Sequence, residues 1–249
     1  MLDEARRTSF DKKAAQYEAV RPSYPEALVD DVLARTGARR LLEIGAGTGK
    51  ATEKFMQRDC TITALEPGAQ LAAVLRAKAS ANVRIEQTRF EDFPDTGYDL
   101  VYAAQAFHWV EPAVRFAKAA AVARWLAVIT TEKDPIDPDL RAELDVAYDR
   151  WMADASDFAR HEVARTRAYW LDEIDTSGYF GPVHVGAFPW HTSYATREYI
   201  DLLDTYSDHA TLPADRQTPL YDAIAQAIDR RGGRIAIPYV TLVFLAERR

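Results

Sequence analysis

Residues 41–49 read Leu-Leu-Glu-Ile-Gly-Ala-Gly-Thr-Gly and decide the fold class of this 249-residue chain. A short apolar run that stops at a glycine is typical of a buried strand, and Gly45, Gly47 and Gly49 predict a tight turn after it. A glycine lets a ligand approach the backbone closely because it has no side chain. The stretch therefore predicts a strand, a ligand-binding loop and then a helix over residues 48–58.

The glycine spacing argues against the two commonest nucleotide-binding loops. A dinucleotide-binding loop, G-x-G-x-x-G, needs its third glycine where this chain has Lys50. A Walker A loop needs four residues between its first glycine and Gly-Lys, followed by Ser or Thr. Here three residues separate Gly45 from Gly49, and Ala51 follows Lys50. An NAD-dependent oxidoreductase is therefore disfavoured.

Outside the glycine loop, short apolar runs alternate with helical patterns, as in a parallel sheet covered by helices. Because β-α-β units cross over right-handed, we expect an α/β fold with a doubly wound, mostly parallel seven-stranded sheet. One domain is expected over residues 1–249, with an N-terminal helical lid at 10–36 and a helical insertion over the site at 134–180. The expected strands span residues 41–44, 60–65, 83–88, 99–103, 125–130, 183–190 and 235–246, and the later helices span residues 69–79, 112–122, 140–158, 196–206 and 219–230.

Glu66 ends the second expected strand, about twenty residues beyond the glycine loop, as in dinucleotide-binding folds. In doubly wound folds an acidic residue at this position accepts hydrogen bonds from ribose hydroxyls. A lone glutamate at a strand end is more often a surface residue. The combination of Glu66 with the loop predicts a ligand that contains a ribose.

The run Glu43-x-Gly45-x-Gly47-x-Gly49 closely resembles motif I of the class I S-adenosylmethionine (SAM)-dependent methyltransferases. The resemblance implies a Rossmann-like methyltransferase fold, SAM as cofactor and S-adenosylhomocysteine as product. It also implies an apolar residue against the adenine ring and an acidic residue at the adenine amino group, in the turn after the third strand. Residues 90–92, Phe-Glu-Asp, occupy that turn, where Phe90 and Glu91 fit these roles best and Asp92 is the rival for the acidic one.

Residues 103–109, Ala-Ala-Gln-Ala-Phe-His-Trp, resemble the stretch that lines the sulfonium side of the pocket in small-molecule methyltransferases with an A-x-H-W signature. The resemblance implies that Ala104 or Gln105 contacts the cofactor and that His108 and Trp109 face the acceptor. If the acceptor is a hydroxyl, His108 is the expected catalytic base, because an imidazole titrates near neutral pH. The alternative is that His108 caps the following helix and Trp109 belongs to the core.

Residues 10–25 follow the pattern F-x-x-x-A-x-x-Y-x-x-x-R-P-x-Y-P, which resembles the N-terminal segment of methyltransferases similar to trans-aconitate methyltransferases. The resemblance implies a helix that closes over SAM, with Tyr17 and Arg21 at the methionine carboxylate, which suits a planar guanidinium. It also implies that Tyr24 and His209 help to bind the substrate. The complete expected cofactor-binding set is Tyr17, Arg21, Glu43, Gly45, Ala46, Gly47, Gly49, Glu66, Pro67, Phe90, Glu91, Ala104 and Gln105.

The chain departs from this family at residues 120–125, Ala-Ala-Val-Ala-Arg-Trp, where members usually carry a Leu-x-Pro-Gly-Gly turn before the fifth strand. The departure puts the geometry of that turn in doubt. It does not affect the glycine loop, which lies on other strands.

The composition bears on partners and location. The chain has 38 acidic and 31 basic residues, a net charge of −7, which disfavours nucleic acid as a partner. Cys60 is the only cysteine, so no intrachain disulfide is possible and a reducing compartment is expected. The N-terminus lacks an apolar signal-peptide segment and no run approaches ~18 apolar residues. We therefore expect a cytoplasmic protein without a membrane partner or a metal site, either a monomer or a homodimer.

These features predict transfer of a methyl group from SAM to an oxygen of a small organic acceptor, either a hydroxyl or a carboxylate. Alignment in a dry chamber can supply much of the catalysis, and a carboxylate needs no base. The alternative is a SAM-binding protein that catalyses another reaction or acts as a binder. Aromatic residues of the insertion either enclose the acceptor or belong to the core: Trp151, Phe158, Tyr169 and Trp170.

Overall fold

The computed structural model describes residues 14–152 and 162–249 of the chain. Residues 10–13 of the N-terminal motif and Phe158 of the insertion lie outside the described residues. The chain divides into two compact units, and the expected lid at 10–36 and insertion at 134–180 each contribute to both. Unit 1 contains Met1–Pro22, Glu132–Arg165 and Pro189–Val240, and unit 2 contains Ser23–Thr131, Thr166–Phe188 and Thr241–Arg249.

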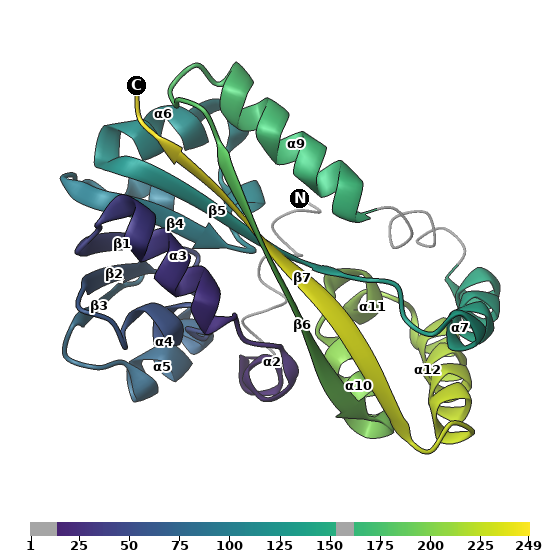
Figure 1. Ribbon diagram of the computed structural model, residues 1–249. Helices are drawn as coiled ribbons and strands as arrows, with labels where there is room; N and C mark the ends of the chain where they lie inside the picture. Colours follow the sequence, from purple (N-terminus) through teal and green to yellow (C-terminus); the bar gives the residue numbers. More distant parts are fainter. Residues whose placement is uncertain (1–13, 153–161) are drawn as a thin grey trace. The chain divides into compact units, whose positions relative to one another are not determined.

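Seven strands form one sheet in the order β3-β2-β1-β4-β5-β7-β6 (Figure 1). The strands β1 to β5 are parallel to one another. The last strand, β7, is antiparallel to β5, because Arg248 N–H donates to the Arg124 carbonyl near one end and Asp134 N–H donates to the Pro238 carbonyl near the other. The predicted α/β fold with a seven-stranded, mostly parallel sheet is therefore confirmed. The strands are β1 Arg40–Ile44, β2 Thr61–Leu65, β3 Val83–Glu86, β4 Tyr98–Ala104, β5 Ala123–Lys133, β6 His184–Ala195 and β7 Arg234–Glu247.

The strand order reverses between β1 and β4, since β2 and β3 lie on one side of β1 and β4 and β5 on the other. Ligands of doubly wound sheets bind outside the carboxyl ends of the strands at such a switch point. The glycine loop follows β1, and residues 105–109 follow β4. The topology therefore places the two stretches singled out in the sequence on either side of the switch point.

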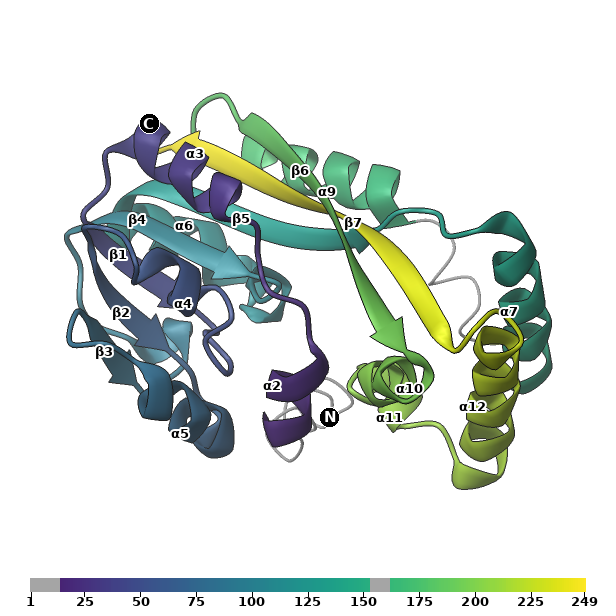
Figure 2. The same cartoon turned by 60° about the horizontal axis from the view of Figure 1, so that its bottom comes forward.

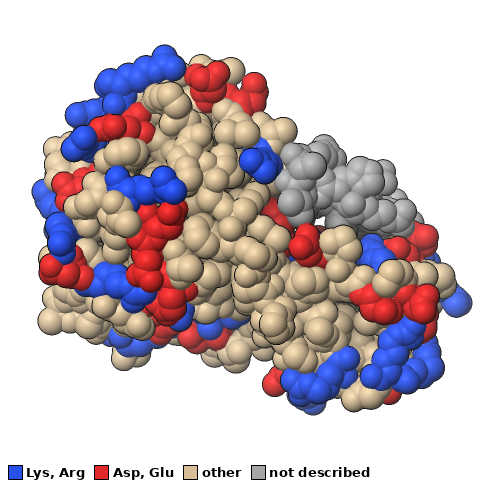
Figure 3. All heavy atoms as spheres, in the orientation of Figure 1, with Lys and Arg blue, Asp and Glu red and all other residues tan. Residues whose placement is uncertain are grey.

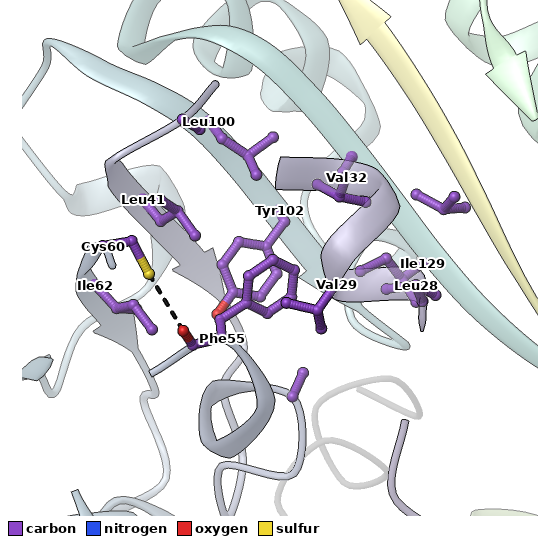
Figure 4. Packing of buried hydrophobic residues seen from close by; sticks show 14 of the residues in the cluster. Leu28, Val29, Val32, Leu41, Phe55, Cys60, Ile62, Leu100, Tyr102 and Ile129 are labelled. Carbon is purple, nitrogen blue, oxygen red and sulfur yellow. Dashed lines mark hydrogen bonds between the residues drawn. The ribbon is translucent and has the colours of Figure 1, made fainter. Parts of the chain in front are cut away.

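The core of unit 2 lies between the sheet and its helices. Strands β1 and β2 each have four consecutive buried residues after an exposed first one, as expected for parallel strands covered on both faces. Phe55 and Tyr102 stack with their ring centroids 4.4 Å apart, and the Cys60 thiol donates to the Phe55 carbonyl oxygen at 3.2 Å (Figure 4). The helices associated with unit 2 are α3 Glu26–Thr36, α4 Thr52–Phe55, α5 Ala69–Lys78, α6 Pro112–Val122 and α9 Glu162–Thr176, with 3-10 turns η1 Phe90–Asp92 and η2 Phe107–Trp109.

Unit 1 has its own apolar core, to which Leu144, Leu203, Ile224 and Ile228 contribute fully buried side chains. Helices α7 and α12 lie side by side in both ribbon views (Figures 1 and 2). Asp137 caps α7, because its carboxylate accepts a hydrogen bond from the Leu140 N–H at 2.9 Å. The helices of unit 1 are α2 Ala14–Val20, α7 Pro138–Trp151, α10 Thr196–Asp204, α11 Ser207–Ala210 and α12 Ala214–Asp229.

The helix expected at 140–158 is instead α7, which ends at Trp151. Two other predicted helix boundaries are wrong for identifiable physical reasons. The helix expected at 48–58 is only the short α4, because positive φ angles at Gly47 (57°) and Gly49 (91°) keep the preceding backbone out of the helical region. Helix α12 begins at Ala214 and not at Pro219, which lies inside the helix. Proline usually marks a first helical turn, but the buried face formed by Leu220, Ile224, Ala227 and Ile228 extends over the following turns and holds the helix in place. None of the described helices is long and apolar enough to span a bilayer.

Arg115 on α6 joins that helix to α9 within unit 2. Its side chain is buried and forms an ion pair with Glu173 and a 3.0 Å hydrogen bond to the Tyr169 hydroxyl. The guanidinium also lies 5.3 Å from the centroid of the Trp170 ring, a cation–π contact. Trp170 is thus a buried core residue, whereas Tyr169 remains largely exposed.

We predict that Arg115→Met lowers the free energy of unfolding by about 2–3 kcal/mol, because Glu173 loses its cation and the Tyr169 hydroxyl its partner. Arg124→Met is the matched control, since the Arg124–Glu247 ion pair is exposed and such pairs contribute about 1 kcal/mol or less. Denaturant unfolding of both variants measures the difference. Equal losses in the two variants would contradict the structural role given to Arg115.

Candidate active site

The glycine loop is held in place by backbone hydrogen bonds and by close packing at two of its three glycines. Ala46 N–H donates to the Leu65 carbonyl at the end of β2 (2.9 Å). A Cβ atom added to Gly45 would lie 2.6 Å from the Ala106 Cβ, and one added to Gly49 would lie 2.4 Å from a Leu75 methyl carbon. These two positions therefore require glycine because the protein itself fills the space.

Gly47 differs from its two neighbours in the loop. Its φ angle is +57°, but an added Cβ would meet no described atom within 4 Å. Glycine at this position therefore leaves open space beside the backbone. Such a bare, open stretch of main chain can accept a ligand at van der Waals distance.

Glu66 ties the glycine loop to the end of β2. Its carboxylate is 5% exposed and accepts hydrogen bonds from the Gly47 N–H at 2.8 Å and from the Gly68 N–H at 2.7 Å. The intervening Pro67 is exposed. The structure thus brings Glu66 and the loop together as the spacing predicts, and the binding of a ribose by Glu66 stays a prediction.

Glu43 is a buried carboxyl group beneath the loop. One of its oxygens accepts hydrogen bonds from the Thr52 hydroxyl at 2.6 Å and from the Tyr102 hydroxyl at 2.8 Å. Burial raises the pKa of Glu43 to about 7, although both hydrogen bonds act in the opposite direction, and the charge of Glu66 raises it further. Near neutral pH Glu43 therefore exists in both protonation states.

The turn after β3 carries Phe90 and Glu91. The Phe90 ring is buried, and the Lys118 ammonium lies 5.5 Å from its centroid. Burial alone would raise the pKa of Glu91, but hydrogen bonds from backbone N–H groups, including that of Glu111, together with Arg89, lower it overall. Asp92, the rival for the acidic role, is exposed. An ionised Glu91 at this edge of the sheet agrees with an acceptor of hydrogen bonds, and its contact with adenine stays a prediction.

Gln105 follows β4 in a strained conformation. Its φ of 58° makes it the one non-glycine residue with a positive φ among residues 14–152 and 162–249. Two hydrogen bonds hold this backbone, from the Gln105 N–H to the Ile129 carbonyl and from the Gln105 side chain to the Thr131 carbonyl, both 2.9 Å. Strain of this kind costs about 1–3 kcal/mol and is concentrated at functional sites. Ala104, half-buried at the end of β4, precedes it.

His108 and Trp109 lie in η2, with their ring centroids 4.8 Å apart. The surrounding protein and, to a lesser degree, the Arg115 charge lower the pKa of His108 to about 4. The His108 side chain is nevertheless exposed to solvent. The imidazole is neutral at pH 7 and a weaker base than an isolated histidine.

The remaining expected site residues divide between the two units. Tyr24 belongs to unit 2 and packs against its core. In unit 1, Arg21 donates two 2.8 Å hydrogen bonds, to the hydroxyl and to the carbonyl oxygen of Thr205, and its guanidinium lies 5.1 Å from the Tyr17 ring centroid. His209, also in unit 1, is buried, and desolvation lowers its pKa to about 4.

The part of the chain that contains the glycine loop and Glu66 is also similar to known proteins. Residues 42–126 match the methyltransferase domain family. An uncharacterised methyltransferase of Mycobacterium tuberculosis is 30% identical over 242 residues, which cover 94% of this chain and 93% of the relative. The chain belongs to the class I SAM-dependent methyltransferases.

Two further proteins are similar to this methyltransferase over most of their length. An uncharacterised methyltransferase-like protein of Schizosaccharomyces pombe is 26% identical over 253 residues, 96% of this chain and 95% of the relative. A solved structure from Anaeromyxobacter dehalogenans, provisionally described as a type II methyltransferase, superposes with a TM-score of 0.67 at 22% identity. That superposition covers 91% of this chain and 97% of the other, and it shows a shared fold.

SAM is the methyl donor that membership of this family implies. The residues present fit such a group on three observations: open space beside Gly47, a buried carboxylate at Glu66, and a strained Gln105 at the end of the neighbouring strand. Sequence reasoning did not single out Thr52 and Tyr102, the partners of Glu43. The register of the β1–β4 pairing could have identified Tyr102, because Tyr102 lies opposite Glu43 in that pairing.

We predict that Glu43→Gln changes how the stability of this methyltransferase depends on pH. Since the pKa of Glu43 rises from 4.5 to about 7 on folding, its contribution to the free energy of unfolding decreases as pH rises from 4.5 to 7. The neutral amide removes this loss, so the variant gains roughly 1–3 kcal/mol relative to wild type between pH 4.5 and pH 8. Denaturant unfolding at both pH values measures the gain, and parallel pH profiles of the two proteins would refute it.

We also predict that Gly47→Ala weakens binding of S-adenosylhomocysteine at least about tenfold, because a methyl group enters the ligand's space. Gly37→Ala is the matched control, since Gly37 has a similar φ of +62° and likewise no atom within 4 Å of an added Cβ. Both variants should lose a similar ~1–2 kcal/mol of stability from the positive φ. Isothermal calorimetry that finds the same affinity in both variants would exclude ligand contact at Gly47.

Proposed function

We propose that this methyltransferase transfers the methyl group of SAM to an oxygen atom of a small organic molecule, with a carboxylate or a hydroxyl as acceptor. The observation that carries the donor half of the proposal is the Glu66 carboxylate bonded to Gly47, whose other side is open. In this proposal SAM also contacts Phe90 and Glu91 with its adenine and Gln105 on its sulfonium side.

The charge of the chain supports a small acceptor. The net charge is −7, and Lys and Arg side chains are interspersed with Asp and Glu on the face visible in Figure 3. A polyanionic substrate is normally bound by a concentrated basic surface. We therefore propose a small-molecule substrate, no nucleic-acid partner and, as the sequence analysis expects, a cytoplasmic location for a monomer or homodimer.

When bound, SAM supplies a methyl group activated by its positively charged sulfonium. The chain's own residues then have two tasks. Glu66, with Gly47, orients the donor through its ribose, and Gln105, held by its two hydrogen bonds, defines the wall at the end of β4. Alignment of reactants accounts for a large part of catalysis in displacements of this kind.

The state of His108 distinguishes the two oxygen acceptors. A hydroxyl must lose its proton during transfer, and a base whose pKa lies below its ordinary value assists that loss less well. A carboxylate reacts as the anion and needs no base. The low pKa of His108 therefore favours a carboxylate acceptor within the proposal, and it agrees with the resemblance of residues 10–25 to the trans-aconitate methyltransferase group.

Incubation of the protein with methyl-labelled SAM and a panel of organic acids and matched alcohols, followed by mass spectrometry, tests the proposal. We expect a labelled methyl ester and S-adenosylhomocysteine in stoichiometric amounts. Labelled SAM that binds but transfers no label to any acid or alcohol would favour the alternative, a SAM-binding protein with another reaction.

Glu66→Gln provides the variant for this assay. We expect it to lower kcat/KM for SAM by roughly 10–100-fold, because an amide oxygen is a weaker and less charged acceptor than a carboxylate. Glu143→Gln, which removes an exposed carboxylate paired with Arg230 and Arg231, is the control and should behave as wild type. An unchanged kcat/KM in Glu66→Gln would contradict the role proposed for Glu66.

A further inference from the structure

Unit 1 contains a group of cationic and phenolic side chains, of which only Arg21 is among the residues expected at SAM. They converge from strand ends and from the helices around α10, although they lie far apart in the sequence. We call this group the cation–tyrosine cluster, and its members are Arg21, Lys133, Tyr194, Tyr199, Tyr206 and Tyr239.

Two positive charges of the cluster flank one aromatic ring. The Lys133 ammonium lies 4.7 Å from the Tyr206 ring centroid and 5.8 Å from that of Tyr199. The Arg21 guanidinium lies 4.0 Å from the same Tyr206 ring. Cation–π contacts of this kind attract, but they do not neutralise a charge.

Neither cation has a carboxylate partner within 4.0 Å among the residues that the structure describes. Arg21 instead donates to Thr205. Lys133 is exposed to solvent and Arg21 is half-buried, and the charge of Arg21 opposes that of Lys133. The pair therefore creates a local positive potential that an anion would stabilise.

Two phenols of the cluster have no hydrogen-bond partner of good geometry. The Tyr194 and Tyr239 hydroxyls are buried, at 7% and 3% residue exposure, and neither forms a well-aligned hydrogen bond, although the two groups are neighbours. A buried hydroxyl without a partner costs about 1–3 kcal/mol. Burial raises the pKa of both phenols, so they keep their protons as donors.

Tyr206 responds to the same two charges. Its burial would raise the pKa of the phenol, but Lys133 and then Arg21 lower it overall. The positive potential inferred from the missing counter-ions thus acts on a group in the middle of the cluster. An oxyanion placed beside Tyr206 would feel the same stabilisation.

We propose that the cation–tyrosine cluster is a binding site for the carboxylate of a small organic acid. A carboxylate accepts up to about four hydrogen bonds and can use the Lys133 ammonium and the Tyr194 and Tyr239 hydroxyls together. Neutral phenols outnumber cations in the cluster, which suits a singly charged group better than a phosphate dianion. The inference rests on the proposed function only in the choice of organic acids as the ligands.

Calorimetric titration of the full-length protein tests the site without any methyl transfer. The ligands are succinate, citrate and benzoate, with succinamide and benzamide as neutral analogues and inorganic phosphate as the competing oxyanion. We expect saturable binding of at least one acid at least tenfold tighter than that of its amide. No saturable binding of any acid, or tighter binding of phosphate than of every acid, would overturn the proposal.

Variants assign the binding to the cluster. Lys133→Met and Tyr194→Phe should each weaken the acid at least fivefold. Arg150→Met is the matched control and should leave affinity unchanged, since it also removes a cation beside an aromatic ring of unit 1, 4.8 Å from the Trp151 centroid. Tyr194→Phe keeps the packing of the ring, so it remains informative if Lys133→Met is poorly folded. Unchanged affinity in both cluster variants would place the acid elsewhere.

S-adenosylhomocysteine distinguishes the two possible sources of the carboxylate, because it carries the methionine carboxylate of the donor. We expect Lys133→Met to bind it as wild type does. A matching loss of its affinity would overturn the assignment to the acceptor and assign the cluster to the donor. Failure of wild-type protein to bind S-adenosylhomocysteine, with acid binding intact, would instead count against the proposed function and leave the acid site standing.

Discussion

The hydrogen bond from the Gly47 N–H to the Glu66 carboxylate is the interaction on which the candidate site depends. It joins the loop after β1 to the end of β2, across the strands next to the switch point of the sheet. A second bond, from the Gly68 N–H, fixes the same carboxylate. Because charge-assisted hydrogen bonds are stronger than neutral ones, this connection holds the loop in a shape in which Gly47 remains uncovered.

The rest of the loop follows from that constraint. Gly45 and Gly49 pack directly against Ala106 and Leu75, so the protein occupies the space on their sides and leaves it open at Gly47. Two carboxyl groups then lie close to one segment of backbone. Burial raises the pKa of Glu43, and the charge of Glu66 raises it further; Glu43 lies beneath the loop and accepts hydrogen bonds from the Thr52 and Tyr102 hydroxyls. The two acids therefore have different surroundings, one in the core and one at the open side of the loop.

Much of this arrangement can be predicted from sequence because it is local. The glycine spacing and Glu66 predict the loop and its acidic neighbour, and Pro112 at a helix start predicts α6 with its observed bounds. The length of α4 is harder to predict, since it depends on the φ angles of the glycines. Helix α12 shows the converse, because tertiary burial outweighs the local signal of Pro219.

Features that depend on tertiary contacts cannot be predicted from the sequence. Arg115 resembles any helix-surface arginine in the sequence, yet it is buried between α6 and α9. Lys133 ends a strand and has no motif around it, and only the fold brings Tyr199 and Tyr206 to its ammonium group. For His108 the sequence predicts a base that titrates near neutrality, whereas its surroundings lower the pKa. For Arg115 and Lys133 the neighbours that change the chemistry come from distant parts of the chain.

The most direct measurement of the central claim is a calorimetric comparison of S-adenosylhomocysteine with its 2′,3′-dideoxy analogue. If Glu66 holds the ribose, loss of the two hydroxyls weakens binding by at least about tenfold in the wild-type protein, the value of roughly one charge-assisted hydrogen bond. In Glu66→Gln the two ligands should then bind with nearly equal affinity. Equal binding of both ligands by the wild-type protein would show that the carboxylate at the end of β2 does not recognise the sugar.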